Sequence, residues 1–387
     1  MAIARSGQGR AVALVALGSQ IHPVFMLPPV AVSAFGAVVA GHVSLPVALL
    51  HATAIGSAVY VAHVKDGYVD YYARGEDDDH PLTVRGCRLG LLLGSVLFGA
   101  TTLGVSLIGT PLGAVLTLPT WFLGYFHAPA LDTTPLGATL DYPSGVALAA
   151  LGGFASQTGY LDREILGFAG VLFVLLAGVK IIDDAQDVEW DRENGKVTVP
   201  VALGRRRSRY LSYALMAVTS LGVLGLASLD VVPDGSAIGV FVFAAVFALA
   251  ADAPFERATM LLVRGAYLLL AFFIVAVWYH PLASNPDPGV WLGGQYLYLA
   301  SEIVFLVVSI VLIRKTGRLR SALKTVALLY PIAYVWDWYT LQVGIFAITR
   351  RTGIDVLGIP LEEHLFIVVV PLFVVSLHET RRKWTGM

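Results

Sequence analysis

The sequence predicts an all-α, polytopic membrane protein, with a bundle of about nine helices followed by a module of about three. Of the 387 residues, 57% are hydrophobic and only 14% are charged, whereas soluble proteins carry about 25% charged residues. Apolar runs of about 20 residues, enough to span a bilayer, recur along the chain, and residues 91–109 form one without charge. These runs are too long for barrel strands of about 10 residues, and otherwise only helices satisfy their backbone amides in hydrocarbon.

The hydrophobic pattern places about twelve membrane spans along the chain. Nine of them precede residue 281, and three follow it. The expected spans are 11–41, 45–64, 87–109, 112–127, 143–159, 164–183, 209–229, 236–252, 262–280, 291–313, 322–347 and 363–379.

Basic residues predict which side of the membrane each loop faces, because Lys and Arg accumulate in cytoplasmic loops. With a cytoplasmic N-terminus, nearly all basic clusters fall inside, and outside loops such as 40–46 and 230–236 carry none. Arg163, Arg350 and Arg351 are the exceptions. We therefore expect a multi-pass protein of the cell membrane, in contact with lipid, with its N-terminus and its aspartate-rich loops in the cytoplasm.

A proline-rich stretch at 279–294 predicts a boundary near residue 285, with domains 1–284 and 285–387. The formal net charge of −1 gives no global field that would favour a nucleic-acid partner. The single cysteine, Cys87, excludes an intrachain disulfide and a cysteine-based metal cage.

Carboxylates crowd the end of the sixth expected span. Asp184, Asp187 and Asp191 are spaced three and four residues apart, so on a continuous helix they share one face. Three like charges on one face repel one another unless a cation lies among them. Mg²⁺ prefers oxygen ligands and often bridges one or two carboxylates to the phosphates of a substrate. We therefore expect a magnesium site here.

A second acidic loop follows the second span, where Asp66 and Asp70 are one helical turn apart. Both loops fall on the cytoplasmic side and can face each other across a cavity. Together with Lys196, Arg85 and Arg88, bound metal ions would hold a diphosphate and neutralise it as the carbon–oxygen bond breaks. The alternative is that both are hydrated loops whose acids cap helices.

These motifs resemble those of the UbiA superfamily of intramembrane prenyltransferases. Residues 184–204 carry the pattern D-x-x-D-x-x-x-D, followed by GKVT, Pro and Gly, and the likeness extends over about residues 10–280. It implies Mg²⁺-dependent ionisation of a prenyl diphosphate and attack on the allylic cation by an acceptor inside the bundle. By the same likeness, Asp66 and Asp70 hold one magnesium, and Asp187 and Asp191 hold the other.

The sequence departs from the UbiA pattern in three places. Gly67 stands where the family's first motif has an acid, and His80 precedes Pro81-Leu82 where the family has Arg. The loop at 126–145 has no Lys or Arg, although relatives often contact diphosphate from it. The acceptor therefore stays open at this point.

The last hundred residues place acids within apolar spans. Glu302 and Asp337 lie inside such runs, and Glu362 and Glu363 open the last one. A charged group near the bilayer centre costs about 3 kcal/mol on insertion scales, so such acids usually face a cavity and serve a function. A protonated carboxyl in an apolar pocket can donate its proton to an alkene. Alternatively, Glu362 and Glu363 cap an interfacial helix, and Glu302 pairs with a basic side chain.

This segment resembles the membrane-bound lycopene cyclase domain of bacteria, archaea and fungi. The likeness rests on Tyr330-Pro331, Trp336-Asp337 and, most specifically, the box Pro360-Leu361-Glu362-Glu363. It implies that Glu302, Asp337, Glu362 and Glu363 protonate a polyene end and close a ring. The family uses two three-helix repeats and this chain has one, so a homodimer or a second cyclase-type subunit would supply the other.

The two likenesses together favour a Mg²⁺-dependent prenyltransferase whose acceptor is a polyene such as lycopene, with a C-terminal module that cyclises polyene ends. Asp187, Asp191 and Lys196 would act in prenyl transfer. Three alternatives stay open: a membrane terpene synthase that cyclises a prenyl diphosphate, a prenyltransferase for naphthoate or quinone-type acceptors, and a scaffold without catalytic activity.

Overall fold

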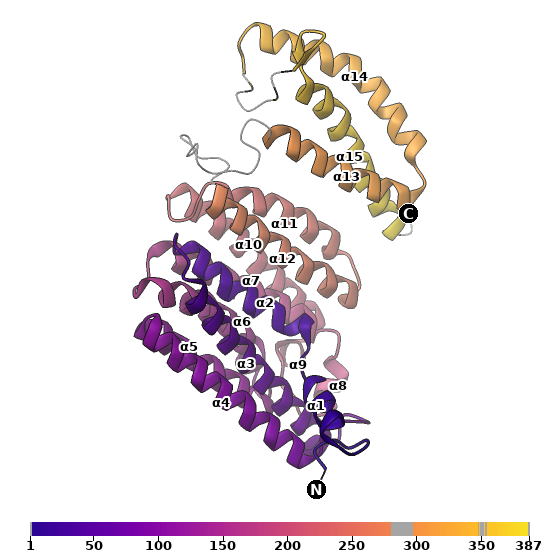
Figure 1. Cartoon of the computed structure of the whole chain (residues 1–387). Coiled ribbons are helices and arrows are strands. Elements are labelled where there is room, and N and C mark those ends of the chain that lie inside the picture. Colours follow the sequence, from indigo (N-terminus) through magenta and orange to yellow (C-terminus); the bar gives the residue numbers. More distant parts are fainter. Residues whose placement is uncertain (1, 280–296, 347, 349–351, 353, 386–387) are drawn as a thin grey trace. The chain divides into compact units, whose positions relative to one another are not determined.

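The computed structural model describes residues 2–279, 297–346, 348, 352 and 354–385 (Figure 1). The chain divides into two compact units, Met1–Ser284 and Asn285–Met387. Most of the proline-rich stretch behind the boundary prediction, and two of the basic exceptions, Arg350 and Arg351, lie outside the described residues.

The first unit is helical throughout, and nine of its helices in the described residues are long. Two π-helical turns, η1 (Val69–Arg74) and η2 (His127–Leu131), extend α3 and α5. The helices are α1 (Arg10–Gly18), α2 (Pro23–Val39), α3 (Leu45–Tyr68), α4 (Val84–Ile108), α5 (Pro111–Phe126), α6 (Pro135–Thr158), α7 (Arg163–Asp184), α8 (Val188–Glu193), α9 (Val199–Leu203), α10 (Arg205–Ser228), α11 (Ser236–Ala251) and α12 (Phe255–Tyr279).

Local sequence fixes where several of these helices begin. The side chains of Thr83, Thr110 and Thr134 each accept a hydrogen bond from a glycine amide three residues later, at 3.0, 3.1 and 3.1 Å. Asp162 accepts one from the amide of Ile165 at 3.0 Å. Such N-caps satisfy amides that have no partner within the helix.

The all-α membrane class predicted from the sequence is confirmed. Within the residues that the structure describes, six helices are long and apolar enough to cross a bilayer, and two shorter helices, 25–39 and 236–251, are apolar. One expected span is wrong in detail: the run 11–41 is two helices, α1 and α2, separated at 19–22. Pro23 explains the break, because its ring favours the first position of a new helix and lacks the amide that would continue the previous one.

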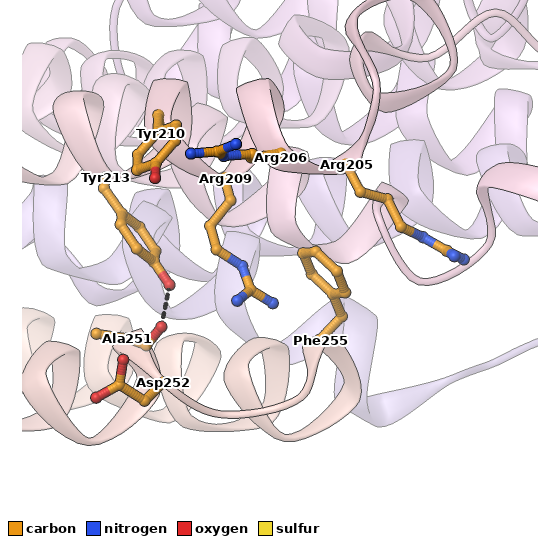
Figure 2. Close-up of a pocket in the computed structure, with 8 residues that line it drawn as sticks. All are labelled: Arg205, Arg206, Arg209, Tyr210, Tyr213, Ala251, Asp252 and Phe255. Atoms are coloured by element: carbon orange, nitrogen blue, oxygen red, sulfur yellow. Dashed lines mark hydrogen bonds between the residues drawn. The ribbon is translucent and has the colours of Figure 1, made fainter.

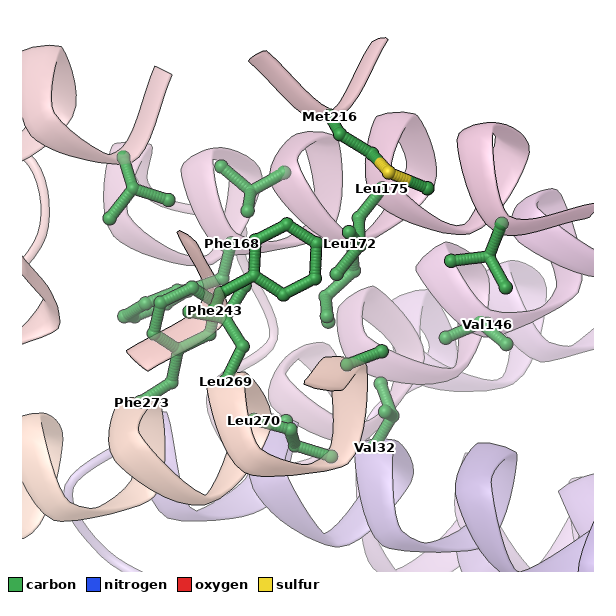
Figure 3. Close-up of a cluster of buried hydrophobic side chains, with 14 of the residues drawn as sticks. Val32, Val146, Phe168, Leu172, Leu175, Met216, Phe243, Leu269, Leu270 and Phe273 are labelled. Atoms are coloured by element: carbon green, nitrogen blue, oxygen red, sulfur yellow. The ribbon is translucent and has the colours of Figure 1, made fainter. Parts of the chain in front are cut away.

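The main core of the first unit lies among α2, α6, α7, α10, α11 and α12 (Figure 3). The rings of Phe35 and Phe168 meet at a centroid distance of 5.0 Å. A Cβ added to Gly36 would lie 2.1 Å from the carbonyl oxygen of Ala150, so α2 and α6 pack backbone to backbone. Because lipid is as apolar as this core, such close packing stabilises the bundle more than burial does.

The second unit contains α13 (Leu297–Thr316), α14 (Leu319–Gln342) and α15 (Leu361–Thr385). A small hairpin, β1 (Asp355–Val356) with β2 (Ile359–Pro360), precedes α15. Its two-residue turn has φ of 49° at Leu357 and 87° at Gly358, as tight antiparallel hairpins require. The three helices agree with the predicted three-helix module.

Candidate active site

The first acidic segment lies where α3 widens into η1. Asp66 belongs to the last turns of α3, and Asp70 belongs to η1. The Asp66 side chain is 40% exposed, whereas that of Asp70 is 15% exposed. Gly75 ends the segment in the left-handed region, with φ of 69°, so the chain turns away directly after the two aspartates.

The second acidic segment is not the single helical face that its spacing predicts. α7 ends at Asp184 and α8 begins at Val188. The turn between them leaves Asp184 and Asp191 buried and Asp187 exposed. Arg205 stabilises this break, because its guanidinium donates to the carbonyl oxygens of Ala185 and Gln186 at 2.9 and 3.0 Å. The prediction of one helical face is wrong because a distant arginine binds the carbonyl groups at the end of α7, which the spacing of the aspartates does not reveal.

The two acidic segments meet through Lys196. Its Nζ lies 3.1 Å from Glu76 Oε2 and 4.0 Å from Asp70 Oδ1. The Glu76 side chain is fully buried, and its other oxygen lies 3.5 Å from Arg74 Nε. Lys196 also lies 4.6 Å from the centre of the Trp190 ring. A lysine from the second segment therefore pairs with carboxylates of the first.

A third segment, between α5 and α6, reaches the same place. Arg74 pairs with Asp132 at 2.6 Å. His127 Nε2 lies 3.9 Å from Asp66 Oδ1, and its Nδ1 contacts Asp141 of α6. The loop that lacks Lys and Arg therefore brings a histidine and two carboxylates to the acidic segments.

Six residues at this meeting place were missed by the sequence analysis. Two of them had a signal, because Arg74 follows Asp70 by four residues and Lys180 precedes Asp184 by four, the spacing of helical ion pairs. Lys180 does contact Asp184. The remaining four depend on the tertiary fold, and they are Glu76, His127, Asp132 and Asp141.

Arg85 and Arg88 do not join these contacts in the part of the chain that the structure describes. Both are exposed in the first turns of α4. Among the described residues, the Lys and Arg side chains with a nitrogen within 4.0 Å of the five aspartates predicted to bind metal are Arg74, Lys180 and Lys196. The structure therefore gives no support to the two arginines as diphosphate ligands.

The carboxylate oxygens present here fit a metal ion whose coordination shell is completed by a substrate. Oδ2 of Asp184 and Oδ1 of Asp132 are buried without a hydrogen-bond partner. Among the described residues, no three His, Cys, Asp or Glu side chains already form a metal cage. Mg²⁺ does not require one, because it commonly takes one or two carboxylates and completes its shell with water and phosphate.

Asp191 lies outside the membrane-spanning helices and is buried. Burial raises the pKa of its carboxyl, while the hydrogen bond from Thr198 and the nearby charges of Lys196 and Lys180 oppose that rise. Thr198 Oγ1 donates to Asp191 Oδ2 at 3.2 Å. A cation near Asp191 would stabilise its charged form.

Three acids of the second unit lie close to Tyr298, and they are Glu302, Asp337 and Glu363. Tyr298 Oη donates to Glu363 Oε1 at 3.0 Å, and Asp337 of α14 lies close enough to Glu363 for their charges to interact. Glu302 is 5% exposed, Glu362 is fully buried and Glu363 is 4% exposed. Burial of all three argues against a purely interfacial cap, although Glu362 does accept the backbone amide of Thr352.

Each of the two units matches a known protein family. Residues 26–258 match the UbiA prenyltransferase family, and residues 295–380 match the lycopene cyclase family. A digeranylgeranylglyceryl phosphate synthase from Thermococcus gammatolerans is 27% identical over 152 residues, which cover 35% of this chain and 53% of the relative. The chain thus spans about half the length of this relative.

Solved structures show the same fold. A UbiA homolog from Aeropyrum pernix, in its apo form, superimposes with a TM-score of 0.55 at 18% identity, covering 66% of this chain and 97% of the homolog. A UbiA homolog from Archaeoglobus fulgidus, bound to GPP and Mg²⁺, gives 0.51 at 16% identity, covering 69% and 99%. Because the family match extends over more than half of its residues, the chain belongs to the UbiA prenyltransferase family.

Proposed function

We propose that this protein transfers a prenyl group from an isoprenyl diphosphate to a hydrophobic acceptor in the membrane, and that the acceptor is a polyene such as lycopene. One observation carries the choice of acceptor: the region that matches lycopene cyclases follows the prenyltransferase region on the same chain. Two enzymes fused in one chain commonly act on one pathway. We place the border between them near residue 285, and the acidic segments on the cytoplasmic side.

In this proposal, Asp66 and Asp70 hold one Mg²⁺, and Asp187 and Asp191 hold the other. When bound, the metal neutralises negative charge on the diphosphate leaving group. The exposure of Asp66 and Asp187 supports this assignment, because each carboxylate can reach a ligand outside the protein core.

Lys196 is the cation best placed to hold the diphosphate. It already lies between Asp70 and Glu76, so a phosphate that enters between the acidic segments meets its ammonium group. His127 Nε2 lies 3.9 Å from Asp66 Oδ1 and offers a second donor. The bond from C1 of the prenyl group to oxygen breaks, its electron pair stays on the diphosphate, and the acceptor alkene supplies the electrons of the new carbon–carbon bond. The carbocation that this leaves on the acceptor then loses a proton to the released diphosphate, which gives the net gain of C5H8.

The second unit would act on the polyene end by acid catalysis. Asp337 and Glu363 are buried within the unit, and their carboxyl groups lie close enough for their charges to interact, so a proton held by one of them would be kept away from water. Transfer of that proton to an end-group alkene would start ring closure without redox change. The single repeat requires a second copy of the chain or a second cyclase-type subunit.

The experiment incubates membranes that contain the protein with dimethylallyl diphosphate, Mg²⁺ and lycopene, and follows the products by mass spectrometry. We expect lycopene to gain C5H8 for each transfer, and Asp187→Asn to abolish the gain. Arg207→Gln is the matched control, because Arg207 is exposed. Absence of any gain beside a competent control enzyme would reject the polyene acceptor.

Two other functions are distinguished by the same preparation. The likeness to digeranylgeranylglyceryl phosphate synthases favours a phosphate-bearing glyceryl lipid as acceptor, which would gain prenyl mass while lycopene does not. A membrane terpene synthase would instead release a cyclic hydrocarbon from geranylgeranyl diphosphate with no acceptor added.

A further inference from the structure

A pocket of about 440 Å³ lies between the start of α10 and the turn that joins α11 to α12 (Figure 2). Three arginines of α10 line it, together with two tyrosines of the same helix and Asp252 and Phe255 of the turn. Tyr213 Oη donates to the carbonyl oxygen of Ala251 at 2.6 Å and so holds one wall to the other. Its volume is within the range of ligand pockets, about 300–1,000 Å³.

One of the arginines already has partners. The guanidinium of Arg205 donates to the carbonyl oxygens of Ala185 and Gln186 and pairs with Glu189. In Figure 2 its side chain points away from Arg209. Arg205 therefore ties the pocket to the turn between α7 and α8 and contributes little to a ligand.

The other two arginines keep their hydrogen-bond donors free of carboxylates. The Arg209 guanidinium lies 4.1 Å from the centre of the Phe255 ring, and that of Arg206 lies 5.8 Å from the centre of the Tyr210 ring. Within the described residues, neither has a carboxylate oxygen within 4.0 Å of its nitrogens. Stacking orients a guanidinium while its N–H edge stays available for bidentate contact with phosphate.

The pocket lies at the level where two candidate membrane helices begin. α10 starts at Arg205 and α12 starts at Phe255, and both are apolar enough to span. Tyr210 is 60% exposed, and tyrosine with arginine at the end of a span is typical of the headgroup layer. Basic pockets between transmembrane helices bind acidic lipid head groups.

We propose that this pocket binds the phosphate-bearing headgroup of an anionic membrane lipid, with Arg206 and Arg209 as its phosphate ligands. The aromatic rings of Tyr210 and Phe255 hold the two guanidinium groups in place. The proposal does not depend on the prenyl-transfer chemistry, because lipid binding is measured directly.

The test measures lipid retention by native mass spectrometry on the full chain, released from detergent with added phosphatidylglycerol or phosphatidylcholine. The variants are Arg206→Gln with Arg209→Gln, and Arg209→Lys, which keeps the charge. Arg207→Gln is the matched control, because it removes an exposed arginine of the same run that does not line the pocket. Melting temperatures show whether each variant is folded.

We expect the wild type and Arg207→Gln to prefer phosphatidylglycerol, and each pocket arginine to contribute about fivefold to that preference. The double variant should lose the preference while it stays folded, and Arg209→Lys should keep part of it. Equal loss in Arg207→Gln would assign the preference to unspecific charge and overturn the proposal. So would tight binding of inorganic phosphate alone, since the ligand would then be a soluble phosphate.

Discussion

Replacement of Lys196 by Met tests whether the two acidic segments act as one site. Methionine keeps most of the apolar stem and removes the ammonium group that lies 3.1 Å from Glu76 and 4.0 Å from Asp70. If Lys196 binds the diphosphate while the carbon–oxygen bond breaks, its removal lowers the rate as the removal of one hydrogen-bond donor to a developing negative charge does. Such a loss lowers kcat by roughly 10²–10³-fold.

The same change has a limited effect on stability. A buried charge left without any partner costs about 3–5 kcal/mol, but Glu76 keeps Arg74 at 3.5 Å. We therefore expect the free energy of unfolding to fall by about 1–3 kcal/mol, the cost of an incompletely satisfied buried group. The protein should stay folded, so the loss of rate reports chemistry.

The assay measures Mg²⁺-dependent hydrolysis of geranyl diphosphate, in which water takes the geranyl cation, so that it does not depend on the identity of the lipid acceptor. Arg88→Gln serves as the comparison, because Arg88 has the charge but is exposed on α4. We expect Lys196→Met to lose activity and Arg88→Gln to keep it. A folded Lys196→Met protein that releases diphosphate within about twofold of the wild-type rate would refute the role of Lys196.

Three further outcomes follow from the contacts of the first unit. Gly67→Ala should lower the melting temperature, because its Cβ would lie 2.8 Å from His80 Nε2. Adding His80→Ala should restore part of that loss. If the effects of the two substitutions on the melting temperature are additive in the double variant, the contact is contradicted. Asp191→Asn should stabilise the metal-free protein at pH 8, because burial raises the pKa of Asp191 in the folded protein and the charged carboxylate then lowers stability. At a pH below the pKa of this carboxyl in the unfolded chain, the variant should gain no stability. Geranyl diphosphate with Mg²⁺ should raise the melting temperature, by mass action, and Asp187→Asn should weaken this rise.

Hydropathy predicted most of the fold, because membrane spans follow from runs of apolar residues. The end of each span is a different matter. Asp184 and Asp191 have helical spacing, yet the helix breaks between them because Arg205, fourteen residues beyond Asp191, binds the carbonyl groups of the turn. Such a contact depends on the packing of α10 against α7, and no local pattern encodes it.

The candidate site shows the same limit. The residue type and spacing of Asp66, Asp70 and Asp191 predict that they belong to the site. Glu76, in contrast, has the sequence context of one more acid in a hydrated loop. In the structure it is a fully buried carboxylate with Arg74 on one side and Lys196 on the other. Its burial is favourable only because both cations are present, and the second arrives from a segment 120 residues later.

The departures from the family pattern also acquire a physical reason. Sequence comparison treats Gly67 and His80 as two separate losses, an acid and an arginine. In the structure the His80 ring occupies the space that a side chain at position 67 would need, and Nδ1 of His80 accepts the amide of Leu82 at 3.2 Å. The two departures therefore belong to one contact, in which the buried ring of His80 fills the space next to Gly67 where the family has an acidic side chain. They leave Asp66 and Asp70 in place, so the departure changes the support of the first acidic segment without removing its carboxylates.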